Sequence, residues 1–260
     1  MILFYLLATV STLFALALAT LTVSTSAIVA GLLGVSPDRP DSLHHSFPRW
    51  WSKIVITLSF VRIKVHAPER AFDGKPHVYV ANHLSFFDVP VLASFLPRAK
   101  FVTKEELFAV PIFGKGMRAV GMVPIQRENK KAAFGALDYG AKSVKSGNSI
   151  VVFPEGTRGS DYSLRSFKKG PFVLAITAGA TIIPVIIHGT HDVLPKGTWL
   201  VRPRQVDVHL LEPVSVEGLN LSDRERVASE VWSRMAEAIE IHYGVKSVAR
   251  KSAPPVPVES

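Results

Sequence analysis

The sequence contains no cysteine among its 260 residues, and this absence excludes several kinds of site. Without thiols the chain forms no disulfide, holds no thiolate zinc site and has no cysteine nucleophile. It also lacks a G-x-S-x-G motif, so nothing indicates a covalent acyl-enzyme. An H-E-x-x-H zinc motif is absent as well. No further ligand accompanies His188, His191 and Asp192, so we expect them to be structural and expect no metal site.

The first 37 residues contain no acidic, basic or histidine side chain, and Asp38 is the first of these. The segment Ile2–Val23 is rich in Leu, Ala and Phe, and its length matches the roughly 20 apolar residues of a membrane-crossing helix. Apolar sequence resumes at Ala27–Val35. A single helix over both runs exceeds the roughly 30 Å bilayer core, so it must tilt, protrude or break near Ser24–Ser26. We predict a membrane anchor over residues 1–36.

A cleaved signal peptide is the alternative interpretation of this segment. It would carry Lys or Arg before the apolar stretch, and this chain has neither there. The first basic residues, Arg39, Arg49 and Lys53, follow the apolar segment. Because basic flanking segments stay on the cytoplasmic side, we expect a membrane protein whose globular part faces the cytoplasm.

The net charge is +9, and 48% of the residues are hydrophobic. A basic balance suits nucleic acid, an anionic lipid surface or a phosphate-bearing substrate. The uncharged N-terminal segment favours a lipid bilayer, and no basic stripe interleaved with aromatic residues is visible. We therefore expect a membrane partner and no nucleic acid.

The segment Arg49–Ile63 carries apolar residues at helical spacing. Trp50 and Trp51 have basic neighbours, a combination typical of the lipid headgroup level. We predict a linker and an interfacial amphipathic helix over residues 37–62. An ordinary helix facing the protein core explains the same pattern equally well.

Beyond this point short β-like runs alternate with helical patterns. The runs are Arg62–His66, His77–Ala81, Lys100–Thr103, Met122–Ile125, Ser149–Phe153, Thr181–Ile187 and Val206–Leu211. Alternating strands and helices predict an α/β domain with a largely parallel sheet flanked by helices. We assign this domain to residues 63–246, and we expect the Pro-rich tail, residues 247–260, to be disordered.

Two helices have recognisable ends. The pattern Asn129–Ser146 stops at Gly147, a common residue after a helix. A second helix is expected to open at a capping box over Ser222–Glu225 and to stop at Gly244.

A histidine and an aspartate follow the second predicted strand. His83 lies where this strand gives way to a loop, a common position for catalytic groups in α/β domains. Histidine is the natural general base near neutral pH, and a carboxylate at its other nitrogen fixes its tautomer. Asp88, five residues later, could supply that carboxylate. The alternatives are an N-terminal helix cap at Asp88 or Ser85 and a structural histidine.

A second polar group follows the strand Ser149–Phe153. Gly156, Thr157 and Arg158 lie at its end, where backbone N–H groups and a guanidinium can hold phosphate oxygens. Glu155 could instead hold the shape of this loop. A polar turn with a surface arginine is the alternative.

These residues resemble the signature blocks of the glycerolipid acyltransferases, specifically the 1-acyl-glycerol-3-phosphate acyltransferases. The resemblance rests on four blocks in the expected order, and it spans about residues 78–189. They are Asn82–Asp88; Lys104–Leu107 with Pro111, Gly114, Gly121 and Val123–Arg127; Phe153–Arg158; and Ile182–Val185 with Gly189. Four ordered blocks are far more specific than one.

The resemblance implies a role for each matching residue. His83 is the implied general base, and Asp88 orients it. The implied substrate-binding residues are Glu155, Gly156, Thr157 and Arg158, with Lys104 and Arg127 on the same basic floor and Lys168 and Lys169 in a basic loop. The implied domain is an α/β acyltransferase domain that needs no cofactor.

The implied reaction transfers a fatty acyl group to the sn-2 hydroxyl of 1-acyl-glycerol-3-phosphate (lysophosphatidic acid), giving phosphatidic acid. The donor is an acyl thioester, either acyl-CoA or acyl carrier protein. Two departures from the family pattern leave the acceptor open: Gln126 replaces a common acid, and Gly159 replaces a common serine. Glycerol-3-phosphate, another lyso-lipid, or a non-catalytic lipid-binding scaffold are the alternatives.

Overall fold

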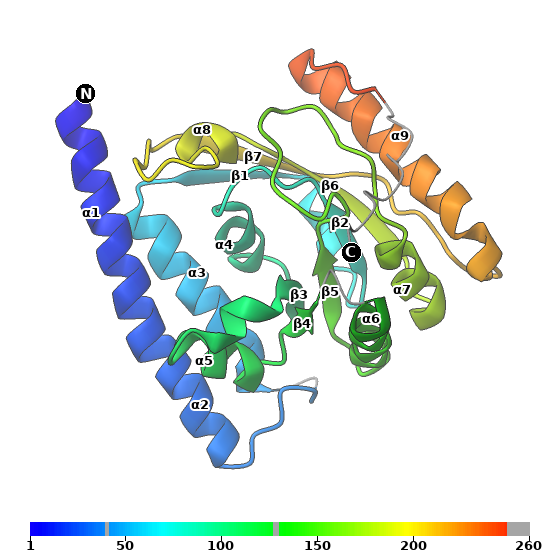
Figure 1. The fold of residues 1–260 in the computed structure, drawn as a ribbon, viewed down its shortest axis with the longest axis horizontal. Coiled ribbons are helices and arrows are strands. Elements are labelled where there is room, and N and C mark those ends of the chain that lie inside the picture. Colours follow the sequence, from blue (N-terminus) through cyan, green and yellow to red (C-terminus); the bar gives the residue numbers. More distant parts are fainter. Residues whose placement is uncertain (40–41, 127–129, 249–260) are drawn as a thin grey trace, which may run out of the picture.

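The computed structural model describes residues 1–39, 42–126 and 130–248, and for residues 130–134 it describes only the backbone. Seven of the described segments are strands, and they form one sheet in the order β1-β7-β6-β2-β5-β3-β4 (Figure 1). They are β1 (Arg62–His66), β2 (Val78–Ala81), β3 (Ala99–Lys104), β4 (Val123–Ile125), β5 (Ser149–Val152), β6 (Ile182–His188) and β7 (Gln205–Leu210). Every neighbouring pair is parallel except β6 and β7, so the predicted largely parallel sheet is confirmed.

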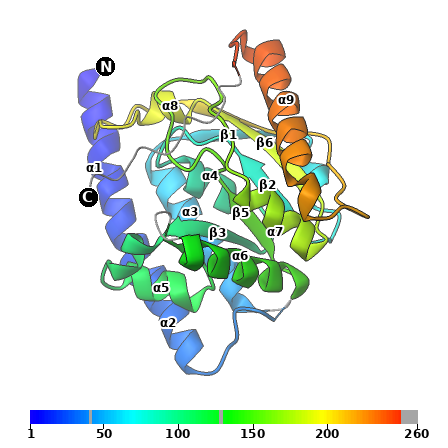
Figure 2. The same ribbon diagram turned by 45° about the vertical axis from the view of Figure 1, so that its right-hand side comes forward.

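Helices cover both faces of this sheet (Figures 1 and 2). α3 (Ser46–Leu58) and α4 (Asp88–Ala93) cover one face, and α6 (Lys130–Lys145), α7 (Gly170–Ala178) and α9 (Arg224–Tyr243) cover the other. The central strand β2 divides its side chains between two cores. Tyr79 and Ala81 belong to the first, and Val78 and Val80 belong to the second. Burial on both faces explains why β2 is a continuous apolar run.

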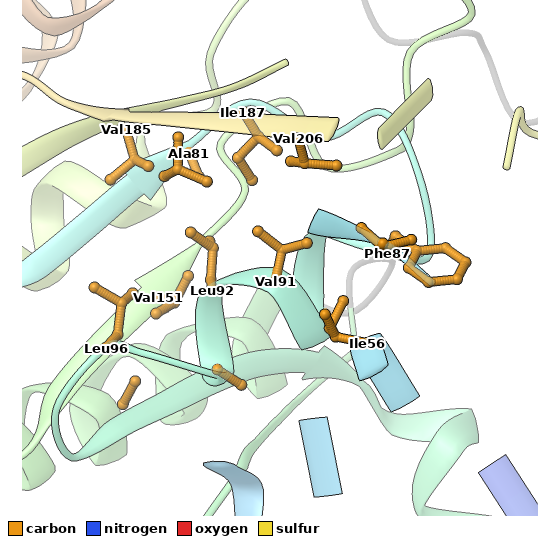
Figure 3. Packing of buried hydrophobic residues seen from close by; sticks show 14 of the residues in the cluster. Ile56, Ala81, Phe87, Val91, Leu92, Leu96, Val151, Val185, Ile187 and Val206 are labelled. Carbon is orange, nitrogen blue, oxygen red and sulfur yellow. The ribbon is translucent and has the colours of Figure 1, made fainter. Parts of the chain in front are cut away.

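α4 ties the loop that precedes it to the sheet. Val91 and Leu92 of this short helix lie over Ala81 on β2 and Ile187 on β6 (Figure 3). All four side chains are fully buried. This packing fixes the position of Asp88, the first residue of the helix.

The uncharged N-terminal segment forms one continuous helix, Ile2–Leu32, that is long and apolar enough to cross a bilayer. It consists of α1 (Ile2–Ala19), a π-helical turn (Thr20–Ser24) and α2 (Thr25–Leu32). At 1.5 Å per residue its 31 residues extend about 46 Å, more than the roughly 30 Å bilayer core. The helix does not break near Ser24–Ser26, because the π-helical turn carries it through this region.

One side of this helix packs against the rest of the chain. Its buried residues are small: Ala8, Thr9, Thr12, Ala15, Ala19, Ser24 and Ala27. Small side chains allow close approach, and hydrogen bonds join Thr12 Oγ1 to Ser59 Oγ (2.8 Å) and Val201 N to Thr9 Oγ1 (2.9 Å). The opposite side exposes Leu and Phe side chains. The helix therefore lies along the domain (Figures 1 and 2), and its outer side is an exposed apolar surface.

The expected amphipathic helix is present but shifted. α3 spans Ser46–Leu58, whereas the pattern predicted Arg49–Ile63. Ser59 Oγ donates to Val55 O, and Phe60 has a positive φ of 56°, so the helix ends before the apolar pattern does. α3 contacts both α1 and α4, so most of its apolar side faces protein. Trp50 is half exposed and remains available to a headgroup region.

The C-terminal helix begins differently from the prediction. The capping box is formed by Asn220 and Asp223, not by Ser222–Glu225, because a short 3-10 turn precedes α9. Ser222 N donates to Asn220 Oδ1 (2.9 Å), and Asn220 N donates to Asp223 Oδ2 (3.0 Å). Asn caps a helix as well as Ser does. α9 ends at Gly244, as predicted, where φ is +68°. Of the expected disordered tail, the part from residue 249 onward lies outside the described residues.

Candidate active site

The loop after β2 is fixed to the neighbouring strand β6 by one side chain. Asn82 Nδ2 donates to Ile187 O (2.9 Å), and Ile187 N donates to Asn82 Oδ1 (2.7 Å). A buried amide that uses both its donor and its acceptor in this way is well satisfied. The next residue, His83, is thereby held at the carboxyl end of β2, close to the end of β5.

His83 and Asp88 are hydrogen-bonded, with 2.7 Å between His83 Nδ1 and Asp88 Oδ2. The same carboxylate oxygen accepts from Leu84 N (2.7 Å) and Ser85 N (2.8 Å). Asp88 is fully buried, whereas the His83 side chain is 16% exposed. Because a carboxylate only accepts, Nδ1 carries the hydrogen and Nε2 presents a lone pair. The imidazole also stacks on Phe153, with 4.1 Å between ring centroids.

The loop after β5 lies against the His83 loop. Gly159 N donates to His83 O (2.8 Å). Glu155 Oε1 accepts from His83 N (2.9 Å), and its other oxygen accepts from Arg165 N (3.4 Å). Burial raises the pKa of Glu155 to about 7. This carboxyl group faces backbone and is almost fully buried, so it holds the shape of the two loops.

A cavity of about 580 Å³ opens beside His83. Its polar lining residues are Ser24, Ser52, His83, Thr103, Lys104, Thr157, Arg158 and Lys196. The apolar lining residues include Val23 of the π-helical turn, Ala27 of α2, Phe47 and Trp51 of α3, Phe101 of β3 and Met117 of α5 (Phe113–Ala119). The cavity therefore combines the imidazole and three cationic side chains with a mostly apolar wall.

The structure brings some of the predicted binding residues together and separates others. Lys104, Thr157 and Arg158 line the cavity with His83, but Glu155 does not. Lys168 lies over Gly156, so that a Cβ added there would meet its side chain at 2.7 Å. Lys169 forms an ion pair with Glu225 on α9 and is turned away from the cavity.

Two further points complete the comparison with the sequence. Arg127 lies outside the described residues. Lys196, in the segment between α8 (Thr190–Val193) and β7, lines the cavity and was missed, because no local motif surrounds it. Within the described residues, no three His, Asp or Glu side chains group closely enough to hold a metal ion. His188 stacks between Tyr162 and Tyr243, with centroid distances of 4.3 and 3.6 Å.

Known proteins share this arrangement of sequence and fold. The family model described as Acyltransferase matches residues 62–188. The 1-acyl-sn-glycerol-3-phosphate acyltransferase of Haemophilus influenzae is 30% identical over 193 residues, which cover 74% of this chain and 79% of that protein. The chain belongs to the 1-acyl-sn-glycerol-3-phosphate acyltransferase family.

Other family members agree in sequence and in structure. The crystal structure of the 1-acyl-sn-glycerophosphate acyltransferase PlsC from Thermotoga maritima superposes with a TM-score of 0.67 at 30% identity, covering 80% of this chain and 81% of that one. The chloroplastic acyltransferase LPAT1 of Arabidopsis thaliana is 32% identical over 200 residues, 76% of this chain and 54% of that protein. The chain thus spans about half the length of several curated relatives that it matches.

Proposed function

We propose that this family member transfers a fatty acyl group from an acyl thioester to the sn-2 hydroxyl of 1-acyl-glycerol-3-phosphate, giving phosphatidic acid. The observation that carries the proposal is the hydrogen-bonded His83–Asp88 pair beside a mostly apolar cavity that is also lined by cationic side chains. The names of the relatives support the same acceptor.

The reaction needs one general base that later acts as an acid. Nε2 of His83 takes the proton of the acceptor hydroxyl while its oxygen attacks the thioester carbonyl carbon. Asp88 stabilises the imidazolium that forms. When the carbonyl is restored, the carbon–sulfur bond breaks, and the leaving thiolate takes the proton from Nε2. The products are an ester and a thiol, and the histidine returns to its starting state.

Several hydrogen-bond donors near His83 are already used within the protein, so they are not available to an oxyanion or a phosphate. The backbone N–H groups of His83, Leu84 and Ser85 donate to Glu155 or Asp88. The side chains of Thr157 and Arg158 line the cavity and can meet an oxyanion or a phosphate. Lys104 and Lys196 add two positive charges to the lining of the cavity.

The apolar part of the cavity and the outer side of α1 suit a lipid substrate. An acyl chain of donor or acceptor would lie against the apolar walls from the π-helical turn, α2, α3 and α5. We propose that the exposed side of α1 rests in a bilayer on its cytoplasmic side, where the acceptor and the product reside. This placement raises the effective concentration of the acceptor at His83.

The experiment is acyl transfer by the detergent-purified chain from labelled acyl-CoA to 1-acyl-glycerol-3-phosphate. We expect phosphatidic acid from the parent and none from His83→Ala, with an unchanged melting temperature. His242→Ala, which alters an exposed histidine on α9, should retain activity. Product with acyl carrier protein or another lyso-lipid alone would reassign the donor or acceptor. No product with any donor or acceptor would contradict the proposed activity and favour a lipid-binding scaffold.

A further inference from the structure

Strand β6 and the segment that follows it hold the His83–Asp88 loop at three places. Asn82 bonds to both backbone groups of Ile187, as described above. Ser85 Oγ donates to Leu194 O (2.8 Å). Thr190 Oγ1 donates to Asp88 Oδ1 (2.5 Å).

Asp88 uses its two oxygens for different partners. Oδ2 accepts from His83 and from two backbone N–H groups. Within the part of the chain that the structure describes, Thr190 is the one donor that reaches Oδ1. Both Asp88 and Thr190 are fully buried, so water does not replace this bond. A carboxylate bonded at both oxygens is fixed in its plane, which keeps Oδ2 directed at the imidazole.

The position of Thr190 is set by a constrained turn. Gly189, immediately before it, has a φ of +100°, and a Cβ there would lie 2.5 Å from Gln205 O on β7. Gly189 N also donates to the hydroxyl of Tyr162 (3.2 Å), in the loop that carries Arg158. The turn is therefore held from two directions, and Thr190 has a defined place at the start of α8.

We propose that Thr190 is a positioning residue whose hydroxyl fixes and stabilises the Asp88 carboxylate, so that Asp88 in turn orients His83 for proton transfer. The inference rests on the proposed acyltransferase function. It adds a third residue to the predicted pair His83 and Asp88. This residue follows β6, the strand that pairs with β2 on the side opposite β5.

The loss of this donor has two consequences for catalysis. The carboxylate loses part of the restraint on its plane, so fewer molecules present a correctly oriented imidazole. Without the hydrogen bond from Thr190, the Asp88 carboxylate also interacts more strongly with the His83 imidazolium. The imidazolium then holds its proton more tightly. In the variant, His83 is therefore deprotonated only at a higher pH, and the acid limb of the pH–rate profile should shift to higher pH.

The test compares Thr190→Val, which keeps the volume and removes the donor, with Thr190→Ser, which keeps the donor. We expect kcat to fall about 10- to 100-fold in Thr190→Val, as for other residues that orient a functional group. KM for the acceptor should change little, and the acid limb should shift to higher pH. Thr190→Ser should keep both kcat and the acid limb close to those of the parent. Thr198→Val, at an exposed threonine, should also match the parent.

The outcomes separate this inference from the proposed function. An inactive parent overturns the acyltransferase assignment itself. An active parent with an equally active Thr190→Val, or an equal loss in Thr190→Val and Thr190→Ser, overturns the positioning role. If Thr190→Val fails to fold, the imidazole NMR titration of His83 in Thr190→Ser and Thr190→Ala decides. A shift in Thr190→Ala alone supports the inference, and identical titrations contradict it.

Discussion

The two carboxyl groups beside His83 have different surroundings. Asp88 accepts four hydrogen bonds, including one from the imidazole. Glu155 accepts two from backbone, and burial raises its pKa to about 7. Asp88 thus supports the charge of an imidazolium, whereas Glu155 holds backbone and is only partly ionised near pH 7.

Glu155→Gln separates a structural role from phosphate binding. We expect kcat to fall by about tenfold, the effect of weakening one hydrogen bond to a charged acceptor, with little change in KM for the acceptor. Steady-state kinetics with varied 1-acyl-glycerol-3-phosphate measures both constants. Arg158→Gln is the comparison, and there KM should rise most, since this side chain lines the cavity. A large KM effect in Glu155→Gln would assign the carboxylate to the substrate.

Glu155 also makes stability depend on pH. Its folded pKa of about 7 lies above the usual value of 4.5, so the folded state binds the proton more tightly than the unfolded chain. The resulting contribution is complete below the usual value and is lost as pH rises through about 7. The difference in melting temperature between parent and Glu155→Gln should therefore vary with pH across this range.

The sequence alone predicts the local half of the candidate site. His83 and Asp88 lie within one turn of chain, so their spacing alone predicts that they can meet. Thr190 and Lys196 come from segments about a hundred residues away, and only the sheet order brings them near. The resemblance gave the residue type of Glu155 but not its direction, which depends on the backbone of the His83 loop.

At the scale of elements, the strands were the most predictable part. Each predicted strand end lies within one residue of the observed end, because alternating apolar runs bounded by turns are local signals. α3 was displaced because the apolar pattern continues beyond the helix into a turn that also packs on the core: Val61 is buried, although the helix ends at Leu58.

The contact between α9 and the edge of the sheet carries a cluster of stacked rings. His209 on β7 stacks on His66 of β1 (4.1 Å) and on His242 of α9 (4.4 Å), and its Nε2 lies 2.7 Å from the hydroxyl of Tyr243. Burial, followed by repulsion from His66 and His242, lowers the pKa of His209 to about 4. Asp207, which accepts from His66, opposes this only in part.

The contribution of this histidine cluster to the stability of the fold should fall at acidic pH. Because the folded pKa of about 4 lies below the usual 6.5, the unfolded chain binds the proton more readily, and stability is lost as pH falls between these values. We expect the melting temperature of His209→Phe, which keeps the ring without the charge, to depend less on pH in this interval. Hydrogen exchange should show the last turn of α9 opening first in the parent. Equal pH dependence in both proteins would contradict the assignment.

At the scale of the whole molecule, the apolar outer side of α1 continues into a neighbouring segment. Phe4 packs on Phe60 with 5.9 Å between ring centroids, and both are half exposed. Trp199 is 71% exposed. It lies in the segment before β7, which is hydrogen-bonded to α1 through Val201 N and Thr9 Oγ1. Lys196, Arg202 and Arg204 are exposed in the same segment. Exposed aromatic side chains beside basic residues suit the headgroup layer of an anionic bilayer.

Tryptophan fluorescence tests this surface. With vesicles that contain anionic and brominated lipids, we expect strong quenching in the parent and clearly less in Trp199→Phe. Trp232→Phe is the control, because Trp232 belongs to α9, at the opposite side of the molecule from α1 (Figures 1 and 2). Its Nε1 donates to Arg165 O in the loop after β5. Equal quenching in the parent and Trp199→Phe would place this segment away from the bilayer.

The bond between Thr9 and Val201 also has a consequence for biosynthesis. The two residues are 192 positions apart, and a ribosome adds roughly 5–20 residues per second, so α1 emerges about 10 to 40 seconds before its partner exists. During that interval α3 is already present, because Ser59, the partner of Thr12, follows 47 positions later, but the segment around Val201 is still missing. A bilayer is the one nearby phase that accepts such a helix, so targeting should precede folding, and the domain should close onto a helix already held by lipid.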